Sequence, residues 1–271
     1  MLNKLAKRLL QMSVVVLVTS LTLTTIVMKP VNAQLETQDS VSTPSTSTSN
    51  ELTRIQESSG IEVILPASYS NKNTYPALII LPYTGGTPAD TFDREFAEQY
   101  AAHTENPFII LLPAVRGSED DYALPGAFTA TIERYENLIK NNLEVLMPKY
   151  NIDPSGVVLG GYSLGGDLSW ALNVRNPSRF RGAIVIGSKS TYPGASNMSQ
   201  LAANGSRFFM IMGEQDENLR AMRLAIEELA KYDVNHRFEI IPSADHYDIF
   251  QQYTPRKMLT QSIDYVLFKK D

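Results

Sequence analysis

Short, mainly apolar runs alternate along this chain with longer segments of helical periodicity, and this alternation limits the fold more than any other feature. Apolar runs of strand length that lack a polar face are typical of strands buried on both sides of a parallel sheet. Seven such strands are expected, at residues 61–65, 77–81, 108–112, 157–159, 183–186, 208–212 and 238–241.

The segments between these runs repeat apolar residues every three or four positions. One such repeat runs from Ile132 to Leu146, and Pro148 is expected to end that helix. Further helices are expected at residues 164–174, 217–232 and 258–268. Strands and helices in this order predict an α/β fold with a mostly parallel central sheet flanked by helices, and no stretch is long enough for a separate cap domain.

The first 33 residues have the pattern of an export signal. Their early positive charges are Lys4, Lys7 and Arg8. An apolar run follows from Val14 to Val27, and the small residues of Val31-Asn32-Ala33 predict cleavage before Gln34. The run is short of the roughly 20 residues that span a bilayer, which favours a cleaved signal over an uncleaved membrane anchor. The expected product is periplasmic or secreted, with no stable membrane insertion once the signal is removed.

The remaining chain divides into a linker and a folded domain. Residues 34–54 are rich in Ser and Thr, cannot bury much apolar surface, and are expected to form a flexible linker. The folded domain is expected at residues 55–271. Beyond the first 33 residues the chain has 20 Lys and Arg against 29 Asp and Glu, which speaks against a nucleic-acid partner. The absence of cysteine excludes disulfides, thiol nucleophiles and thiolate-bound metals.

The most informative motif is a single G-x-S-x-G at residues 161–165. It lies directly after the expected strand at 157–159 and directly before an expected helix. A turn this tight holds the serine hydroxyl above the carboxyl edge of the sheet, and it requires small residues at Gly161 and Gly165. Ser163 is therefore the candidate nucleophile; the alternative is an incidental serine in a glycine-rich turn.

A serine hydroxyl needs a base to become nucleophilic at neutral pH. The chain has three histidines, at positions 103, 236 and 246. His246 follows the carboxyl end of the expected strand at 238–241, which places it at the same sheet edge as Ser163. His103 and His236 are expected to be structural or surface residues.

The base in turn needs an acid that orients the imidazole. Asp216 is the first choice, because it follows the expected strand at 208–212 and reaches the same edge. Glu214 follows the same strand and is its competitor, while Asp233 is a more remote choice at a helix end on the opposite edge. The alternative role for Asp216 is to cap the helix expected from Glu217.

An oxyanion also needs two N–H donors aimed at it. The first expected donor is the backbone N–H of Leu164, directly after the nucleophile. The second is expected from the loop at residues 81–86, where Gly85-Gly86 permits a turn that presents N–H groups inward.

Ser163, Asp216 and His246, in this order on alternating strands and helices, resemble the α/β-hydrolase superfamily over about residues 55 to 270. The compact size without a cap resembles the phospholipase/carboxylesterase and the feruloyl-esterase or polyester-depolymerase branches. The motifs that carry the likeness are Gly160–Gly166, Leu81–Gly86 and Asp245-His246. Many relatives have His-Gly where this chain has Pro82-Tyr83. By that alignment the resemblance implies Thr84 as the second oxyanion donor, with Tyr83 as the alternative.

The resemblance implies a serine carboxylesterase that cleaves a small ester through an acyl-enzyme, without a metal or cofactor. The chain has no G-x-G, no G-x-x-x-x-G-K and no H-E-x-x-H. Two alternatives stay open: acyl transfer to an acceptor other than water by the same triad, and a non-catalytic binding module on the same fold. Loops 115–128 and 188–198, which mix polar and aromatic residues, are expected to line the site.

Overall fold

A computed structural model describes residues 52–123, 126–191 and 197–269 of the chain. The expected export signal at residues 1–33 and most of the expected linker at 34–54 lie outside the described residues. Thr53 and Arg54, at the end of that linker, belong to the first strand. Within the described ranges, no helix combines the length and the apolar character needed to cross a bilayer.

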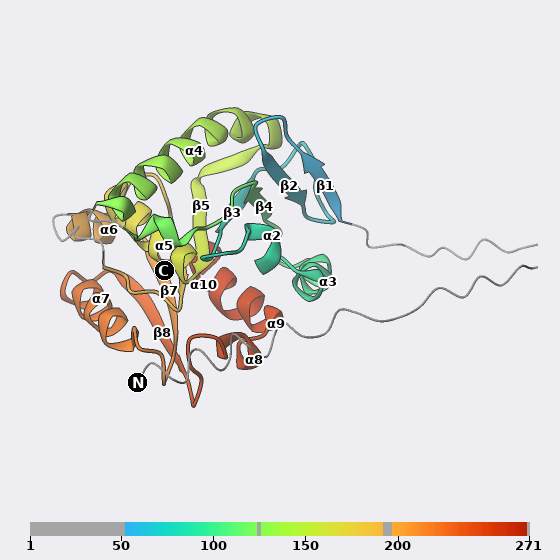
Figure 1. Ribbon diagram of the computed structural model, residues 1–271. Coiled ribbons are helices and arrows are strands. Elements are labelled where there is room, and N and C mark those ends of the chain that lie inside the picture. The colour runs from blue at the N-terminus through green and yellow to red at the C-terminus, as the bar shows by residue number, and fades with distance from the viewer. Residues whose placement is uncertain (1–51, 124–125, 192–196, 270–271) are drawn as a thin grey trace, which may run out of the picture. The chain divides into compact units, whose positions relative to one another are not determined.

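Eight strands form a single sheet: β1 (Thr53–Gln56), β2 (Ile61–Leu65), β3 (Tyr75–Leu81), β4 (Ile109–Pro113), β5 (Ile152–Tyr162), β6 (Gly182–Ile186), β7 (Arg207–Gly213) and β8 (Asn235–Ile241). Their order across the sheet is β1-β2-β4-β3-β5-β6-β7-β8 (Figure 1). Strand β2 runs antiparallel to both β1 and β4, and the strands from β4 to β8 are parallel. This confirms the predicted α/β fold with a mostly parallel sheet.

All seven expected strands are present, and β1 is an additional edge strand that the sequence analysis did not expect. Its four residues are mostly exposed and include Arg54, whose guanidinium pairs with Glu62 on β2 at 2.6 Å. A polar edge strand of this kind has no buried face, so hydrophobic alternation does not reveal it. Strand β5 begins five residues before the expected run. Its first part was not expected because Asp153-Pro154-Ser155 interrupts the apolar pattern.

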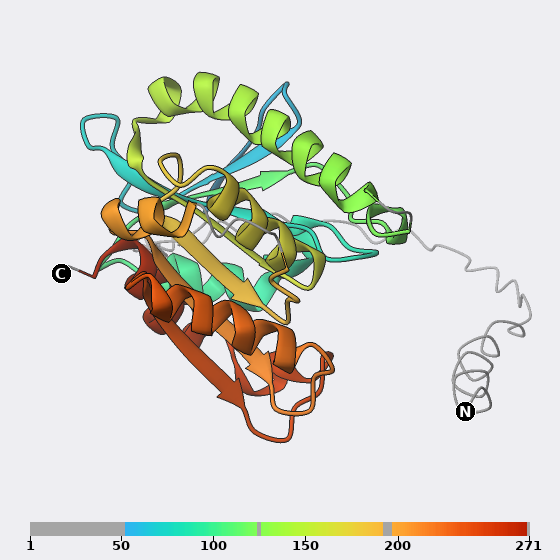
Figure 2. The same ribbon diagram turned by 90° about the vertical axis from the view of Figure 1, so that its left-hand side faces the viewer.

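Helices cover both faces of the sheet. One face carries α4 (Ala127–Tyr150), α5 (Leu164–Arg175), α6 (Met198–Ala203) and α7 (Leu219–Lys231), and Figure 2 is viewed from this side. The other carries α3 (Arg94–Ala102), α8 (Ile249–Gln252), α9 (Pro255–Lys257), the π-helical segment η3 (Met258–Ile263) and α10 (Asp264–Leu267). A short helix, α2 (Pro88–Thr91), precedes α3.

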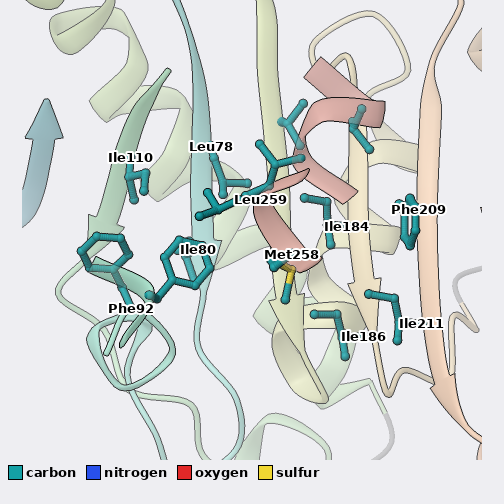
Figure 3. Packing of buried hydrophobic residues seen from close by; sticks show 14 of the residues in the cluster. Leu78, Ile80, Phe92, Ile110, Ile184, Ile186, Phe209, Ile211, Met258 and Leu259 are labelled. Carbon is teal, nitrogen blue, oxygen red and sulfur yellow. The ribbon is translucent and has the colours of Figure 1, made fainter. Parts of the chain in front are cut away.

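The apolar strands divide their side chains between two cores. In β3, Leu78 and Ile80 pack with Met258 and Leu259 of η3 on one face, as Figure 3 shows. The intervening residue Ile79 packs on the opposite face, against α4 and α5. Because both faces of these strands are buried, their sequences are continuous apolar runs rather than alternating ones.

The prediction that Pro148 ends its helix is wrong. Helix α4 continues through Pro148 to Tyr150 and ends at Asn151, whose φ of 51° is left-handed. In the last turn a proline removes only one backbone hydrogen bond, and burial of the Tyr150 side chain offsets that loss. The expected helix at 258–268 is present as η3 and α10.

Candidate active site

Ser163 lies at the turn between β5 and α5, at the carboxyl edge of the sheet. Its φ of 55° and ψ of −117° are a strained conformation for a residue with a side chain, and its N–H donates to the Ile186 carbonyl at 2.9 Å. A Cβ on Gly161 would lie 2.5 Å from the backbone of Gly165, and one on Gly165 would lie 2.5 Å from the Leu81 carbonyl oxygen. The glycines of the motif are therefore required by the close approach of strand, helix and loop.

Three side chains from different strand ends meet at this turn. The Nε2 atom of His246 lies 3.1 Å from the Ser163 hydroxyl oxygen, and its Nδ1 atom lies 2.7 Å from Oδ2 of Asp216. The Asp216 side chain is fully buried and that of His246 is 21% exposed. The structure thus brings together the predicted nucleophile, base and acid in one continuous hydrogen-bonded chain.

Asp216 uses its two carboxylate oxygens for two separate partners. Oδ2 faces His246, and Oδ1 accepts the backbone N–H of Asn218 at 2.8 Å, just before α7 begins. Burial alone raises the pKa of the Asp216 carboxyl, but the hydrogen bonds from His246 and Asn218 outweigh burial and hold that pKa below its ordinary value. Asp216 therefore stays charged at neutral pH. It contacts His246 and the turn before α7 at the same time, but the N-cap of that helix is Asn218, so the alternative that Asp216 caps the helix is wrong.

The residues that were alternatives to Asp216 and His246 have other contacts. The Glu214 carboxylate accepts the Ser243 N–H at 2.8 Å, and Asp233 follows α7 with a φ of 57°. Nε2 of His103 lies 3.2 Å from the carboxylate of Asp264 in α10.

Nδ1 of His236 lies 2.8 Å from the Val234 carbonyl oxygen. Among the residues that the structure describes, neither His103 nor His236 contacts Ser163.

Tyr162 holds the segment that contains His246, a contact that was not expected from the sequence. Its hydroxyl donates to the His246 carbonyl at 2.6 Å, and its ring centroid lies 5.0 Å from the imidazole. Burial raises the pKa of the Tyr162 phenol, which therefore remains a donor. Tyr162 lies within the G-x-S-x-G motif, directly before Ser163. Its contact with His246 could not be read from the motif, because 84 positions separate the two residues in the chain.

The two expected oxyanion donors, Leu164 and Thr84, come from the start of α5 and from the loop after β3. Leu164 is the first residue of α5, so its N–H has no acceptor within the helix. Thr84 lines the cavity that contains Ser163 and His246, whereas Tyr83 lines a neighbouring aromatic cavity. The loop of Thr84 is held by the Gly85 N–H, which donates to the Gly117 carbonyl at 2.9 Å. This placement favours Thr84 over Tyr83.

The cavity above Ser163 has a volume of about 450 Å³ and a polar lining. Tyr122 comes from the expected loop 115–128, and Lys189 comes from the described part of loop 188–198. Asp167, one turn beyond Ser163 in α5, also lines it and was not among the expected site residues. Its signal in the sequence is a lone acid within a mainly apolar helix. In the described ranges, no cluster of three or more His, Asp or Glu side chains is arranged to hold a metal ion.

Residues 53–240 match the model of the family described as "Putative esterase". A search of curated proteins gives no match. Among solved structures, a mutant feruloyl esterase module from Clostridium thermocellum in complex with sinapinate is 14% identical, with a TM-score of 0.56 over 77% of this chain and 84% of that one.

A CE1 ferulic acid esterase from Anaeromyces mucronatus is 16% identical, with a TM-score of 0.55 over 79% of this chain and 90% of that one. An S-formylglutathione hydrolase from Staphylococcus aureus is 13% identical, with a TM-score of 0.56 over 80% and 95%. These likenesses establish the α/β-hydrolase fold. With the family match over most of the chain, they lead to one conclusion: the chain belongs to this esterase family and is a carboxylesterase-type serine hydrolase.

Proposed function

We propose that this protein is an exported serine esterase in which Ser163 is the nucleophile, His246 the general base and acid, and Asp216 the orienting carboxylate. The observation that carries the proposal is the hydrogen-bonded chain from Asp216 through His246 to Ser163, at 2.7 and 3.1 Å. A serine in this contact, on a strained turn at a helix amino end, has the activating base and the electrostatic setting that acyl transfer requires.

The reaction follows from this geometry. His246 takes the proton of the Ser163 hydroxyl while its oxygen attacks the ester carbonyl, and the N–H groups of Leu164 and Thr84 stabilise the resulting oxyanion. His246 then gives the proton to the leaving alcohol, which leaves an acyl group on Ser163. Water, activated by His246, attacks this acyl-enzyme and releases the acid. Asp216 keeps the imidazole in the productive tautomer throughout and stabilises the imidazolium that forms twice.

A fluorophosphonate probe tests the proposal. Such a probe phosphonylates a serine only where a base activates the hydroxyl and an oxyanion site accepts the phosphonyl oxygen. We expect one adduct per chain, located on Ser163 by peptide mapping, and loss of ester hydrolysis in step with labelling. Heat-unfolded protein is the control and should remain unlabelled. An adduct on another serine, or none, would refute the assigned mechanism and favour a non-catalytic binding module.

The exported form is expected to begin at Gln34. The basis is the positively charged start, the short apolar run and Val31-Asn32-Ala33 in the sequence. Amino-terminal sequencing of the protein from its native compartment checks this prediction. Membrane-bound material that still begins at Met1 would show an uncleaved anchor instead.

A further inference from the structure

A buried carboxylate lies in the wall of the catalytic cavity and has no part in the triad. Asp167 is only 5% exposed, yet it lines the same cavity as Ser163. Its backbone N–H donates to the Ser163 carbonyl at 2.9 Å, so the two residues are about one helical pitch apart, roughly 5.4 Å along α5. A group bound by Asp167 would therefore lie close to an ester carbonyl at Ser163.

Three donors hold this carboxylate in a fixed orientation. Oδ2 accepts the Tyr122 hydroxyl at 2.5 Å, and Oδ1 accepts the Ser188 hydroxyl at 2.5 Å and the Ser190 N–H at 3.1 Å. Burial first, and the charge of Asp167 second, raise the pKa of Tyr122, so the phenol keeps its proton and remains the donor.

A carboxylate offers about four acceptor positions, and these contacts use three of them. Among the described residues, no Lys or Arg side chain forms an ion pair with Asp167. One acceptor position thus remains on a charged group that borders the cavity.

The charges around the cavity also favour a ligand group that donates a hydrogen bond and is neutral or positively charged. Glu217 and Asp245 also line the cavity, whereas Lys189 is the one Lys or Arg in the described lining. The Lys189 ammonium stands 5.0 Å from the centroid of the Tyr122 ring rather than in an ion pair with Asp167. The excess of acids disfavours an ester that carries a carboxylate and favours one that carries a neutral or positive donor.

We propose that the site selects esters with a hydrogen-bond donor, a hydroxyl or an ammonium, within a few bonds of the ester carbonyl, and that Asp167 accepts that hydrogen bond. This inference rests on the proposed function of Ser163. Tyr122 and Ser188 are positioning residues, because their hydroxyls donate to the carboxylate and aim it. A hydroxyl and an ammonium group both donate a hydrogen bond to a carboxylate, and esters that carry one or the other distinguish them.

The test compares matched esters in the whole protein and in Asp167→Asn. The substrates are ethyl lactate for the hydroxyl, ethyl alaninate for the ammonium and ethyl propanoate as the donor-free ester. Glycerol monoacetate against propyl acetate examines the alcohol side. We expect the kcat/KM ratio of at least one donor-bearing ester to its donor-free partner to fall about tenfold in Asp167→Asn, mainly through KM, since a neutral amide oxygen accepts a weaker hydrogen bond than a charged carboxylate does. Using the ratio removes any general loss of activity.

Two further variants separate recognition from a purely structural role. Asp153→Asn makes the same chemical change at the opposite end of β5 and should leave the ratios as in the wild type. Tyr122→Phe removes one donor that aims the carboxylate but leaves its charge in place, so the ratios should lie between those of the wild type and those of Asp167→Asn. If Asp167 merely ties loops together, both Asp167→Asn and Tyr122→Phe should lower turnover of the donor-bearing and the donor-free ester alike. The ratio of the two esters would then stay as in the wild type.

A binding experiment makes the inference independent of catalysis. In Ser163→Ala, ligand-detected NMR should show tighter binding of ethyl lactate or ethyl alaninate than of ethyl propanoate, and adding Asp167→Asn should remove that preference. If the binding preference is present but the wild-type protein shows no hydrolysis that depends on Ser163, the proposed function is wrong and the role of Asp167 in recognition stands. Equal preference with and without the Asp167 carboxylate, in both binding and turnover, would overturn the inference.

Discussion

Ser163→Ala is expected to lower kcat for ester hydrolysis by about 10⁴ to 10⁶-fold. The change removes the atom that forms the acyl-enzyme, and the loss of the nucleophile in a serine protease costs ~10⁶-fold in kcat. Alanine is smaller than serine and apolar, and the strained turn is held by backbone contacts and by glycines rather than by the hydroxyl. The fold should therefore persist, which circular dichroism and thermal unfolding would check.

Ser188→Ala provides a matched control for that experiment. Ser188 is a buried serine hydroxyl near the same cavity, but its oxygen contacts Asp167 and Ser190 rather than His246. Its removal should cost far less than the removal of the Ser163 hydroxyl. Comparable losses in the two variants would mean that Ser163 has no special role.

Asp216→Asn is expected to slow ester turnover by ~10⁴-fold with the fold intact. An amide oxygen can still accept the Asn218 N–H, so the turn that leads into α7 should be preserved. Facing His246, however, the amide cannot stabilise the imidazolium, and it favours the wrong tautomer of the ring. Steady-state kinetics on a chromogenic ester measure the loss.

Glu214→Gln is the matched control, because it makes the same change from acid to amide two residues before Asp216. The Glu214 carboxylate is exposed, and within the described part of the chain it accepts one hydrogen bond, from the Ser243 N–H. Turnover should fall by less than about threefold, in keeping with a surface hydrogen bond of roughly 0.5 kcal/mol. Near-normal turnover in Asp216→Asn, or a larger loss in Glu214→Gln, would remove Asp216 from the proposed triad.

The parts of the site that the sequence predicted are those set by local geometry and strand direction. The G-x-S-x-G motif between an apolar strand and an apolar helix predicted the turn at Ser163, because only glycines fit its close approaches. The shared carboxyl edge of parallel strands then predicted that His246 and Asp216 would meet Ser163, although 83 residues separate the serine from the histidine.

Other features depend on contacts that periodicity does not encode. Tyr162 and Asp167 lie close to Ser163 in sequence, but their side-chain contacts are with His246, Tyr122 and Ser188, which the folded chain brings to them. A lone acid in an apolar helix was a usable signal for Asp167. No pattern in the sequence identifies which distant hydroxyls will satisfy such an acid.

The most direct test of the account is acylation of Ser163 by a substrate that deacylates slowly. With p-nitrophenyl dimethylcarbamate, the carbamoyl-enzyme accumulates because water removes the carbamoyl group slowly. The account predicts a burst of p-nitrophenol equal to the amount of protein, and a carbamoyl group that peptide mapping locates on Ser163. Absence of a burst, or a carbamoyl group on any other side chain, would contradict it.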